Sequence, residues 1–236
     1  GGQDELVFDG GSFVLNPDRS IAIQSSWWEE SLVFTNWTNS SDKWLCKKSI
    51  INKDLSKLEN IYNAMVLGLK DYVSKNKFPG VVIGLSGGID SALTAAVAVD
   101  ALGAENVLCV MMPSPYTSNE SIEDAQLLAK NFNIRIESID ISESFSRVKD
   151  SLSSIFKGKA ADLTEENMQS RIRGLILMSL SNKFGSMVVT TGNKSEVSVG
   201  YATLYGDMCG GYSVLKDIYK TTVNELCLWR NKNNIL

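Results

Sequence analysis

A short loop, residues 86–91, contains the residue types best suited to phosphate chemistry; it reads Ser86-Gly87-Gly88-Ile89-Asp90-Ser91. Its two adjacent glycines allow the backbone to approach a ligand closely, and successive N–H groups can then point into one concavity. A helix directly after the loop adds the positive end of its dipole, so a phosphate is the ligand that we expect. The loop has neither the Gly-Lys-Ser/Thr of a Walker loop nor a G-x-G-x-x-G fingerprint.

Asp90 extends this expectation to a metal ion. A carboxylate next to phosphates is repelled unless a cation lies between them, so Asp90 predicts Mg²⁺. The alternative is that Asp90 only complements the helix dipole in the first helical turn. The complete Ser-Gly-Gly-x-Asp-Ser string, placed after an apolar run, favours the phosphate site.

The elements that must position this loop alternate between strands and helices. Continuous apolar runs predict buried strands at residues 81–85, 106–112, 134–139 and 187–190. Apolar residues at three- and four-residue spacing begin a helix at Leu55, and further helices are predicted at residues 92–102, 121–132, 143–155 and 165–184. This order predicts an α/β fold with a doubly wound parallel sheet. Ligands of such sheets bind beyond the carboxyl ends of the strands, here after Leu85, Met112 and Thr190.

The first part of the chain has a different pattern. Within residues 1–34, short apolar runs are separated by turn signals such as Asp9-Gly10-Gly11, which predicts antiparallel β-structure too small to be a domain. The polar stretch from Thr35 to Asp42 predicts a linker or surface loop. We therefore expect three parts: a β-structured segment at residues 1–34, a linker at 35–54 and the main domain at 55–236.

Composition excludes several classes of function. The chain has no histidine, and its four cysteines form no C-x-x-C pair, so the usual zinc sites and Ser–His or Cys–His catalysis are excluded. Such widely spaced thiols are typical of free cysteines in the cytosol. The formal net charge of −4 argues against nucleic-acid binding. No apolar run approaches the roughly 20 residues of a membrane helix, so we expect no membrane partner.

The loop at residues 86–91 resembles the pyrophosphate loop of the N-type ATP pyrophosphatases. This resemblance implies an adenine nucleotide alpha hydrolase-like, Rossmann-like fold that cleaves ATP between its α- and β-phosphates. The superfamily includes NAD⁺, GMP, asparagine and argininosuccinate synthetases. The loop therefore indicates the type of reaction but leaves the substrate open.

A second motif selects among these enzymes. The string Thr191-Gly192-Asn193-Lys194-Ser195-Glu196, followed by residues 200–207, resembles a signature of glutamine-dependent NAD⁺ synthetases. The resemblance implies that ATP is bound by Ser86, Gly87, Gly88, Ile89, Asp90, Ser91 and Thr191, and Mg²⁺ by Asp90 and Glu196. It implies that deamido-NAD⁺ is bound by Asn167, Arg171, Glu196, Asp207 and Lys220. Asp90 and Lys220 would be the catalytic residues, with Lys220 stabilising charge on the phosphates.

The predicted helix at residues 165–184 carries two arginines that cannot share a partner. Asn167 and Arg171 are four residues apart and lie on one helical face, whereas Arg171 and Arg173 do not. By resemblance, this helix meets deamido-NAD⁺ and the dimer interface. The alternative is an amphipathic helix with charged residues on its outer face.

Residues 1–12 resemble the end of a nitrilase-like glutaminase domain, which makes the β-structured segment its remnant. The resemblance implies a cytoplasmic, homo-oligomeric ligase that amidates deamido-NAD⁺ through an adenylate, with ammonia taken from glutamine in the intact protein. The glutaminase nucleophile would lie upstream, and the family's carboxyl-terminal lid would lie beyond Leu236. We therefore expect a fragment that is incomplete alone. A GMP synthetase-like amidotransferase and a non-catalytic nucleotide-binding module remain as alternatives.

Overall fold

The computed structural model describes residues 2–3, 6–40 and 42–233. Residues 1, 4, 5, 41 and 234–236 lie outside this description. They belong to the β-structured segment (1–34), the linker (35–54) and the main domain (55–236) expected from the sequence. The chain divides into two compact units, Gly1–Tyr72 and Val73–Leu236. The division falls within helix α1 (Lys57–Lys75).

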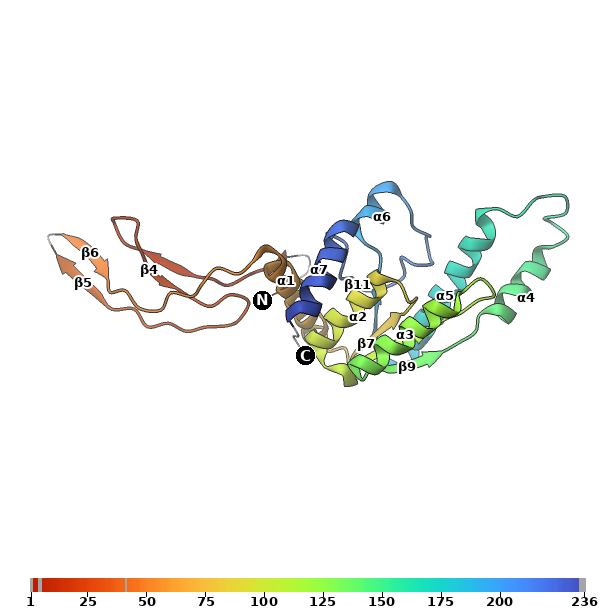
Figure 1. The fold of residues 1–236 in the computed structure, drawn as a ribbon, viewed down its shortest axis with the longest axis horizontal. Helices are drawn as coiled ribbons and strands as arrows, with labels where there is room; N and C mark the ends of the chain where they lie inside the picture. The colour runs from red at the N-terminus through yellow and green to blue at the C-terminus, as the bar shows by residue number, and fades with distance from the viewer. Residues whose placement is uncertain (1, 4–5, 41, 234–236) are drawn as a thin grey trace. The chain divides into compact units, whose positions relative to one another are not determined.

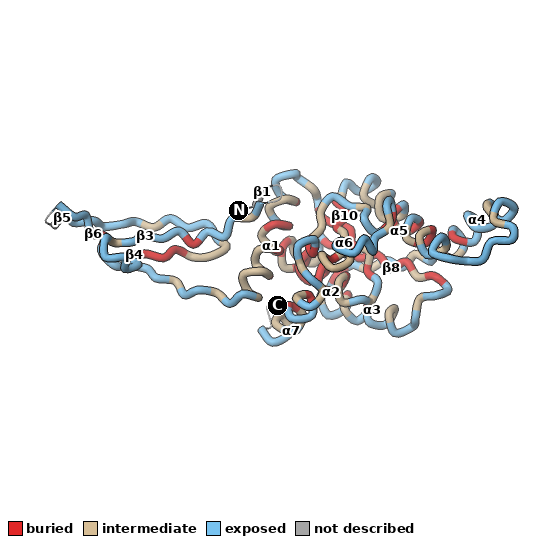
Figure 2. The backbone as a smooth tube through the Cα atoms, turned by 90° about the horizontal axis from the view of Figure 1, so that it is seen from above, coloured by how far each residue is buried: buried red, intermediate tan, exposed pale blue. Residues whose placement is uncertain are grey.

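The first unit contains most of α1 and, among its described residues, three antiparallel strand pairs. These are β1 (Gly2–Gln3) with β2 (Leu6–Val7), β3 (Phe13–Leu15) with β4 (Ile21–Gln24), and β5 (Trp37–Ser40) with β6 (Lys43–Cys46). A small core contains Ala22 and Ile23 of β4 together with Cys46, and β4 is mostly buried (Figure 2). The prediction of antiparallel β-structure from the early apolar runs is confirmed.

The polar stretch from Thr35 to Asp42, which predicts a linker or surface loop, contains a strand instead of a loop. Trp37–Ser40 pairs in register with Lys43–Cys46, so the stretch forms one arm of a hairpin. Asp42 has a φ of 60°, a left-handed conformation that aspartate tolerates and that closes the turn. Backbone pairing requires no apolar side chains, which is why a polarity pattern alone missed this strand.

The second unit contains a five-stranded parallel sheet (Figure 1). Its strands, in chain order, are β7 (Val81–Gly84), β8 (Val107–Met111), β9 (Arg135–Ser138), β10 (Met187–Thr190) and β11 (Tyr212–Ser213). Their spatial order is β11-β10-β7-β8-β9, so the chain builds outward from β7 in one direction and then in the other. The expected doubly wound parallel sheet is confirmed. Its topological switch point lies between β7 and β10, where such sheets bind ligands.

Helices connect these strands, and one more helix follows the last strand. They are α2 (Ile89–Leu102), α3 (Asn119–Phe132), α4 (Ser142–Leu152), α5 (Leu163–Phe184), α6 (Lys194–Val199) and α7 (Lys220–Asn233), with a 3₁₀ turn at Ala104–Asn106. The predicted helices are confirmed with small shifts at their ends. The sequence did not predict α6, α7 or β11. Strand β11 has only two residues, and α7 buries only Val223 and Leu226, so neither produces a clear periodic signal.

The core of the second unit fixes β7 and β8 from both sides. Val82 and Val110 are fully buried and belong to a cluster with Phe145 of α4 and Ile172 of α5. Helix α2 contacts the same two strands and buries several alanines, whose small side chains permit close approach to the sheet. The carboxyl ends of the strands are therefore held rigidly.

The cysteines of the chain are free thiols, as expected from their spacing. Burial raises the pKa of the Cys109 thiol to about 12, so this side chain stays protonated and belongs to the core. Over the residues that the structure covers, no helix is long and apolar enough to cross a membrane.

A nearly buried ion pair joins α7 to α2, which lie side by side (Figure 1). The Arg230 guanidinium donates to both carboxylate oxygens of Asp100 at 2.8 and 3.1 Å. The two side chains are only 11% and 6% exposed. The guanidinium also lies 4.8 Å from the centre of the Phe132 ring. Because α7 begins at Lys220, this contact anchors the helix that carries a predicted catalytic residue.

We predict that Arg230→Met lowers the free energy of unfolding by about 3–5 kcal/mol, because it removes the guanidinium that makes two hydrogen bonds to the nearly buried Asp100 carboxylate. Arg147→Met is the control, since Arg147 pairs with Glu143 on the exposed surface of α4; its loss should cost no more than about 0.5 kcal/mol. Urea denaturation of both variants measures the difference. Equal losses in the two variants would contradict the anchoring role of Arg230.

Candidate active site

The loop after β7 adopts a conformation that only glycine suits. Gly87 has a φ of 81°, and a Cβ at this position would lie 2.3 Å from the carbonyl oxygen of Ser121 on α3. Both facts exclude a side chain there. The loop therefore lies directly against the start of α3, with Ser86 and Gly88 exposed.

Two serine hydroxyls brace the loop from within. Ser91 Oγ donates to the Gly88 carbonyl at 2.9 Å and accepts from Ser86 N at 3.2 Å. Ser86 Oγ lies 3.1 Å from Ser91 Oγ and accepts from Gly88 N at 3.2 Å. The loop is therefore held in one shape before any ligand arrives, which is how a binding site avoids an ordering cost.

Side chains from three distant parts of the chain meet at the switch point. Asp90, in the first turn of α2, accepts a hydrogen bond from Asn193 Nδ2 at 3.0 Å. Its other carboxylate oxygen forms an ion pair with Lys220 Nζ, at the first residue of α7. The Asp90 side chain is 17% exposed and that of Lys220 is 44% exposed. The structure thus brings together Asp90 and Lys220, the two residues expected to be catalytic.

Glu196 reaches the same cluster through Asn193. Asn193 is the N-cap of α6: its Oδ1 accepts from Glu196 N at 3.1 Å, and its own N–H donates to Glu196 Oε2 at 3.0 Å. This reciprocal pair is a capping box. Ser195 Oγ accepts from Lys220 N at 3.0 Å, which ties α6 to the start of α7.

The donor set of this cluster is compatible with a magnesium ion. Mg²⁺ in nucleotide sites commonly takes one or two carboxylates and completes its coordination with phosphates and water. Asp90 and Glu196 are two such carboxylates, both bonded to Asn193. No group of three or more metal-ligating side chains occurs in the described part of the chain. Lys220 already offsets the charge of Asp90, so Asp90 by itself does not require a metal.

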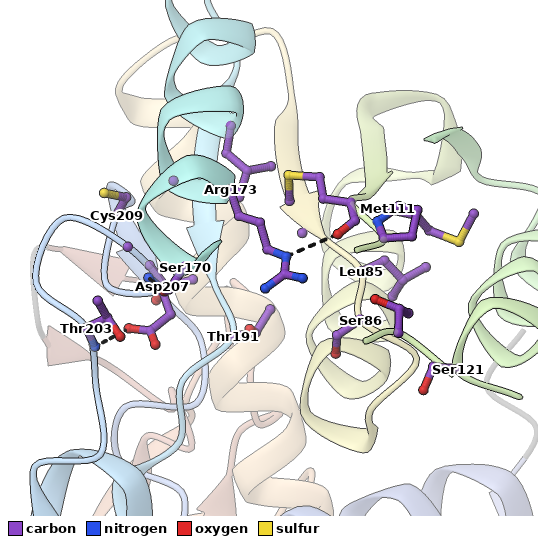
Figure 3. A pocket seen from close by; sticks show the side chains of 18 of the residues that line it. Leu85, Ser86, Met111, Ser121, Ser170, Arg173, Thr191, Thr203, Asp207 and Cys209 are labelled. Carbon is purple, nitrogen blue, oxygen red and sulfur yellow. Dashed lines mark hydrogen bonds between the residues drawn. The ribbon is translucent and has the colours of Figure 1, made fainter. Parts of the chain in front are cut away.

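A cavity of about 370 Å³ opens beyond the carboxyl ends of β7, β8 and β10 (Figure 3). Its size suits a small-molecule ligand. Ser86, Thr191 and Asp207, three of the predicted site residues, line it. Residues that follow the strand ends also line it, among them Leu85, Met112 and Pro113. The expectation that the chemistry lies after these three strands agrees with this placement. Asp90, Glu196, Lys220, Asn167 and Arg171 are not among the lining residues.

Arg173 is the cation of this cavity. Its side chain extends from α5 into the space between Leu85 and Thr191 (Figure 3), and Nε donates to the Met112 carbonyl at 3.1 Å. Among the described residues, no ion pair joins it to a carboxylate. Desolvation lowers the pKa of the guanidinium from its usual value, though it remains charged at neutral pH. A partly buried cation without an acidic partner, facing a cavity, favours an anionic ligand.

One wall of the cavity is a loop that lies against α5. Thr203 Oγ1 donates to Asn167 Oδ1 at 3.0 Å, and Arg171 Nε donates to the Leu204 carbonyl at 3.2 Å. Asp207 N donates to Ser170 Oγ at 3.0 Å. A Cβ on Gly174 would lie 2.8 Å from the Tyr205 carbonyl oxygen, so the loop can approach this closely only because Gly174 lacks a side chain. Asn167 and Arg171 therefore support the wall.

The loop continues this docking at Tyr201 and Asp207. Tyr201 OH donates to Glu166 Oε1 at 3.1 Å, and this hydrogen bond raises the pKa of the phenol. Asp207 Oδ1 accepts from Thr203 N at 2.8 Å, which closes the loop on itself.

Arg171 donates to the Leu204 carbonyl, whereas Arg173 donates to the Met112 carbonyl. The prediction that the two arginines have different partners is confirmed.

Sequence reasoning overlooked two residues of this site. Asn193 was noted only as a member of a matching motif, although an Asn followed three residues later by Glu is a capping signature. Arg173 was noted only in contrast to Arg171, and nothing in its spacing indicated a cavity. The hydrogen bonds of Ser170 and Thr203 join segments more than thirty residues apart. No local sequence pattern predicts such contacts.

Comparison with known proteins gives a consistent result. A protein-family model described as NAD synthase matches residues 61–235. The glutamine-dependent NAD(+) synthetase of Rhodobacter capsulatus is 54% identical over 231 residues, which cover 98% of this chain and 42% of the relative.

Solved structures agree with the sequence match. The glutamine-dependent NAD+ synthetase from Acinetobacter baumannii, in complex with ADP, has a TM-score of 0.95 and 48% identity, covering 99% of this chain and 44% of that one. An NMN synthetase from Francisella tularensis has a TM-score of 0.68 and 30% identity over 76% of this chain and 74% of its own. The chain spans less than half the length of the glutamine-dependent relatives described here. It belongs to the NAD synthase family.

Proposed function

We propose that this chain carries the synthetase site of a glutamine-dependent NAD⁺ synthetase, which amidates deamido-NAD⁺ at the expense of ATP. The observation that carries the proposal is the meeting of Asp90, Asn193 and Lys220 at the switch point, beside a cavity lined by Ser86 and Thr191. Family membership supports the substrate class. The ADP complex of the Acinetobacter baumannii protein supports an adenine nucleotide as ligand.

In this proposal ATP lies across the end of the sheet. The backbone of Ser86, Gly87, Gly88, Ile89, Asp90 and Ser91 holds the pyrophosphate portion, because the loop precedes the positive end of α2. Thr191 contacts the nucleotide from the end of β10, and Arg173 meets an anionic group of the bound ligand. Lys220 stabilises the phosphates as negative charge develops on the leaving group.

The reaction proceeds in two displacements. A carboxylate oxygen of deamido-NAD⁺ attacks the α-phosphorus of ATP, an acyl–O–P bond forms, and the bond to the β-phosphate breaks to release pyrophosphate. Ammonia then attacks the acyl carbon, the carbon–oxygen bond breaks, AMP leaves, and the nitrogen loses a proton to give the amide. Positioning and charge stabilisation are sufficient for both steps if free ammonia is supplied.

Mg²⁺ belongs to the same proposal, with Asp90 and Glu196 as its protein ligands. The ion would neutralise charge on the phosphates and so favour departure of pyrophosphate. The two carboxylates, both bonded to Asn193, support this assignment. Lys220 is the more exposed partner of Asp90 and its chain is flexible, so it can turn from the carboxylate to a phosphate.

The remaining roles concern the second substrate and the whole protein. We propose that Asn167, Arg171, Glu196, Asp207 and Lys220 contribute to binding deamido-NAD⁺, with Asn167 and Arg171 acting partly through the loop that they hold. Residues 1–34 would be the end of a nitrilase-like glutaminase domain that supplies ammonia from glutamine, and residues 35–54 would link it to the synthetase domain at 55–236. A homo-oligomer and a cytoplasmic location complete the proposal; the free thiols support the latter.

Two alternatives are less well supported. A GMP synthetase would share the pyrophosphate loop but not the match to the NAD synthase family. A non-catalytic nucleotide-binding module would not require Asp90, Glu196 and Lys220 to converge. The likeness to an NMN synthetase leaves one narrower choice within the family, between a dinucleotide and a mononucleotide substrate.

A substrate panel decides among these functions. We predict that AMP forms in the full-length protein with deamido-NAD⁺, ATP, Mg²⁺ and ammonia, and much more slowly with XMP or with the acid form of NMN. Faster turnover of XMP would contradict the assignment to NAD⁺ synthesis. The mononucleotide as the better substrate would make the protein an NMN synthetase, and no AMP with any acid would favour the non-catalytic module.

Asp90→Ala should lower the rate of pyrophosphate release at least roughly 100-fold, because it removes a proposed metal ligand and the partner of Lys220. Asp150→Ala removes an exposed carboxylate from α4 and should leave the rate unchanged. The measurement is deamido-NAD⁺-dependent pyrophosphate release by the full-length protein, with circular dichroism to verify folding. Normal turnover of Asp90→Ala would show that the loop does not act as proposed.

Arg173→Met should weaken ADP binding roughly tenfold, because the cavity loses its cation, while binding of uncharged adenosine changes less. Arg173→Lys keeps the positive charge, so its affinity for ADP should lie between those of the wild type and Arg173→Met. Lys183→Met, at the exposed end of the same helix, is the control. Isothermal titration calorimetry measures each affinity. Equal losses for ADP and adenosine would exclude recognition of an anionic group by Arg173.

A further inference from the structure

The two carboxylates of the proposed metal site are both hydrogen-bonded to Asn193, that of Asp90 through the side-chain amide and that of Glu196 through the backbone N–H. Asn193 is 1% exposed and lies directly between the end of β10 and the start of α6. Its Nδ2 donates to Asp90 Oδ1 at 3.0 Å, its Oδ1 accepts from Glu196 N at 3.1 Å, and its N–H donates to Glu196 Oε2 at 3.0 Å. Both carboxylates are therefore bonded to the same residue.

The orientation of this amide is determined by its partners. Rotating the amide by 180° would place its oxygen against the Asp90 carboxylate and its NH₂ group against the N–H of Glu196. Both new contacts would be repulsive, and burial leaves no water to relieve them. Asn193 therefore has one stable orientation, and that orientation defines where Asp90 and Glu196 lie relative to each other.

Lys220 cannot perform the same task. It pairs with the other oxygen of Asp90, but its side chain is 44% exposed and ends a flexible chain. In the proposed reaction it turns toward the phosphates. Asp90 then retains Asn193 as the fixed donor.

We propose that Asn193 is a positioning residue that holds Asp90 and Glu196 in the arrangement needed to bind the metal ion together. The inference rests on the proposed function, in which these two carboxylates are the metal ligands. Asn193 itself contacts neither metal nor substrate. Its task follows from the topology: Asp90 comes after β7 and Glu196 after β10, so a group at the switch point is needed to fix one relative to the other.

The side-chain chemistry separates this task from helix capping. Serine is as good an N-cap as asparagine, but its hydroxyl is too short to reach Asp90 as well. Asn193→Ser therefore keeps the cap of α6 and removes the donor to Asp90. Asn193→Asp keeps the size and both capping bonds, yet places a carboxylate against Asp90. Asn193→Ala removes both functions.

The experiment compares these variants in the full-length protein. We expect Asn193→Ser to melt within a few degrees of the wild type but to need roughly tenfold more Mg²⁺ for half-maximal pyrophosphate release, as is usual when a group that orients a metal ligand is lost. Calorimetry gives a second readout without turnover: Mg²⁺ should strengthen ADP binding less in the variant, while binding of ADP without Mg²⁺ stays unchanged. Asn193→Asp should show the larger loss and serves if Asn193→Ser does not fold.

A matched control is available on another helix. Asp162 caps α5 with the same reciprocal arrangement, using Glu165; it is exposed, and its hydrogen bonds join it to Thr164 and Glu165 of its own helix. Asp162→Ser should leave the Mg²⁺ dependence unchanged. If Asn193→Ser keeps the wild-type Mg²⁺ dependence in both assays, Asn193 is only a helix cap and the inference is wrong. If wild-type protein releases no pyrophosphate, the proposed function fails; the ADP titration still decides the role of Asn193.

Discussion

The contact between Asp90 and Asn193 is the constraint on which the rest of the site depends. These residues are 103 positions apart in the chain and follow the two strands on either side of the switch point. Because the neighbouring parallel strands β7 and β10 end at the same edge, a residue just after one can contact a residue just after the other. Through Asn193 the same contact reaches Glu196, and through Asp90 it reaches Lys220.

The cavity beside this cluster depends on a second constraint, close contacts of the backbone that only glycine permits. Gly87 lets the loop at residues 86–91 lie against α3, and Gly174 lets the loop at residues 203–209 lie against α5. Hydrogen bonds to Asn167 and Ser170, and one from Arg171, then hold that wall in place. The result is an open cavity that a cation, Arg173, lines together with Ser86 of the loop suited to phosphates.

The sequence predicted the sheet and the loop well because both have strong local signals. Continuous apolar runs identified β7, β8, β9 and β10, and the Gly-Gly turn after the first of them marked the edge of the sheet at which we expect the ligand. The hairpin at Trp37–Cys46 and the strand β11 were missed, because they depend on backbone pairing and on tertiary contacts. The same holds for Arg173, whose role depends on a cavity formed by distant segments.

The central proposal is that a carboxylate oxygen attacks the α-phosphorus of ATP at this site to form an acyl adenylate, from which AMP leaves when ammonia attacks the acyl carbon. Deamido-NAD⁺ labelled with ¹⁸O in its carboxylate tests this most directly, with the full-length protein, ATP, Mg²⁺ and ammonia. The account predicts one labelled oxygen in the phosphate of the AMP that forms, because the attacking oxygen departs with AMP when ammonia enters. Unlabelled AMP, or label in phosphate or pyrophosphate, would contradict it.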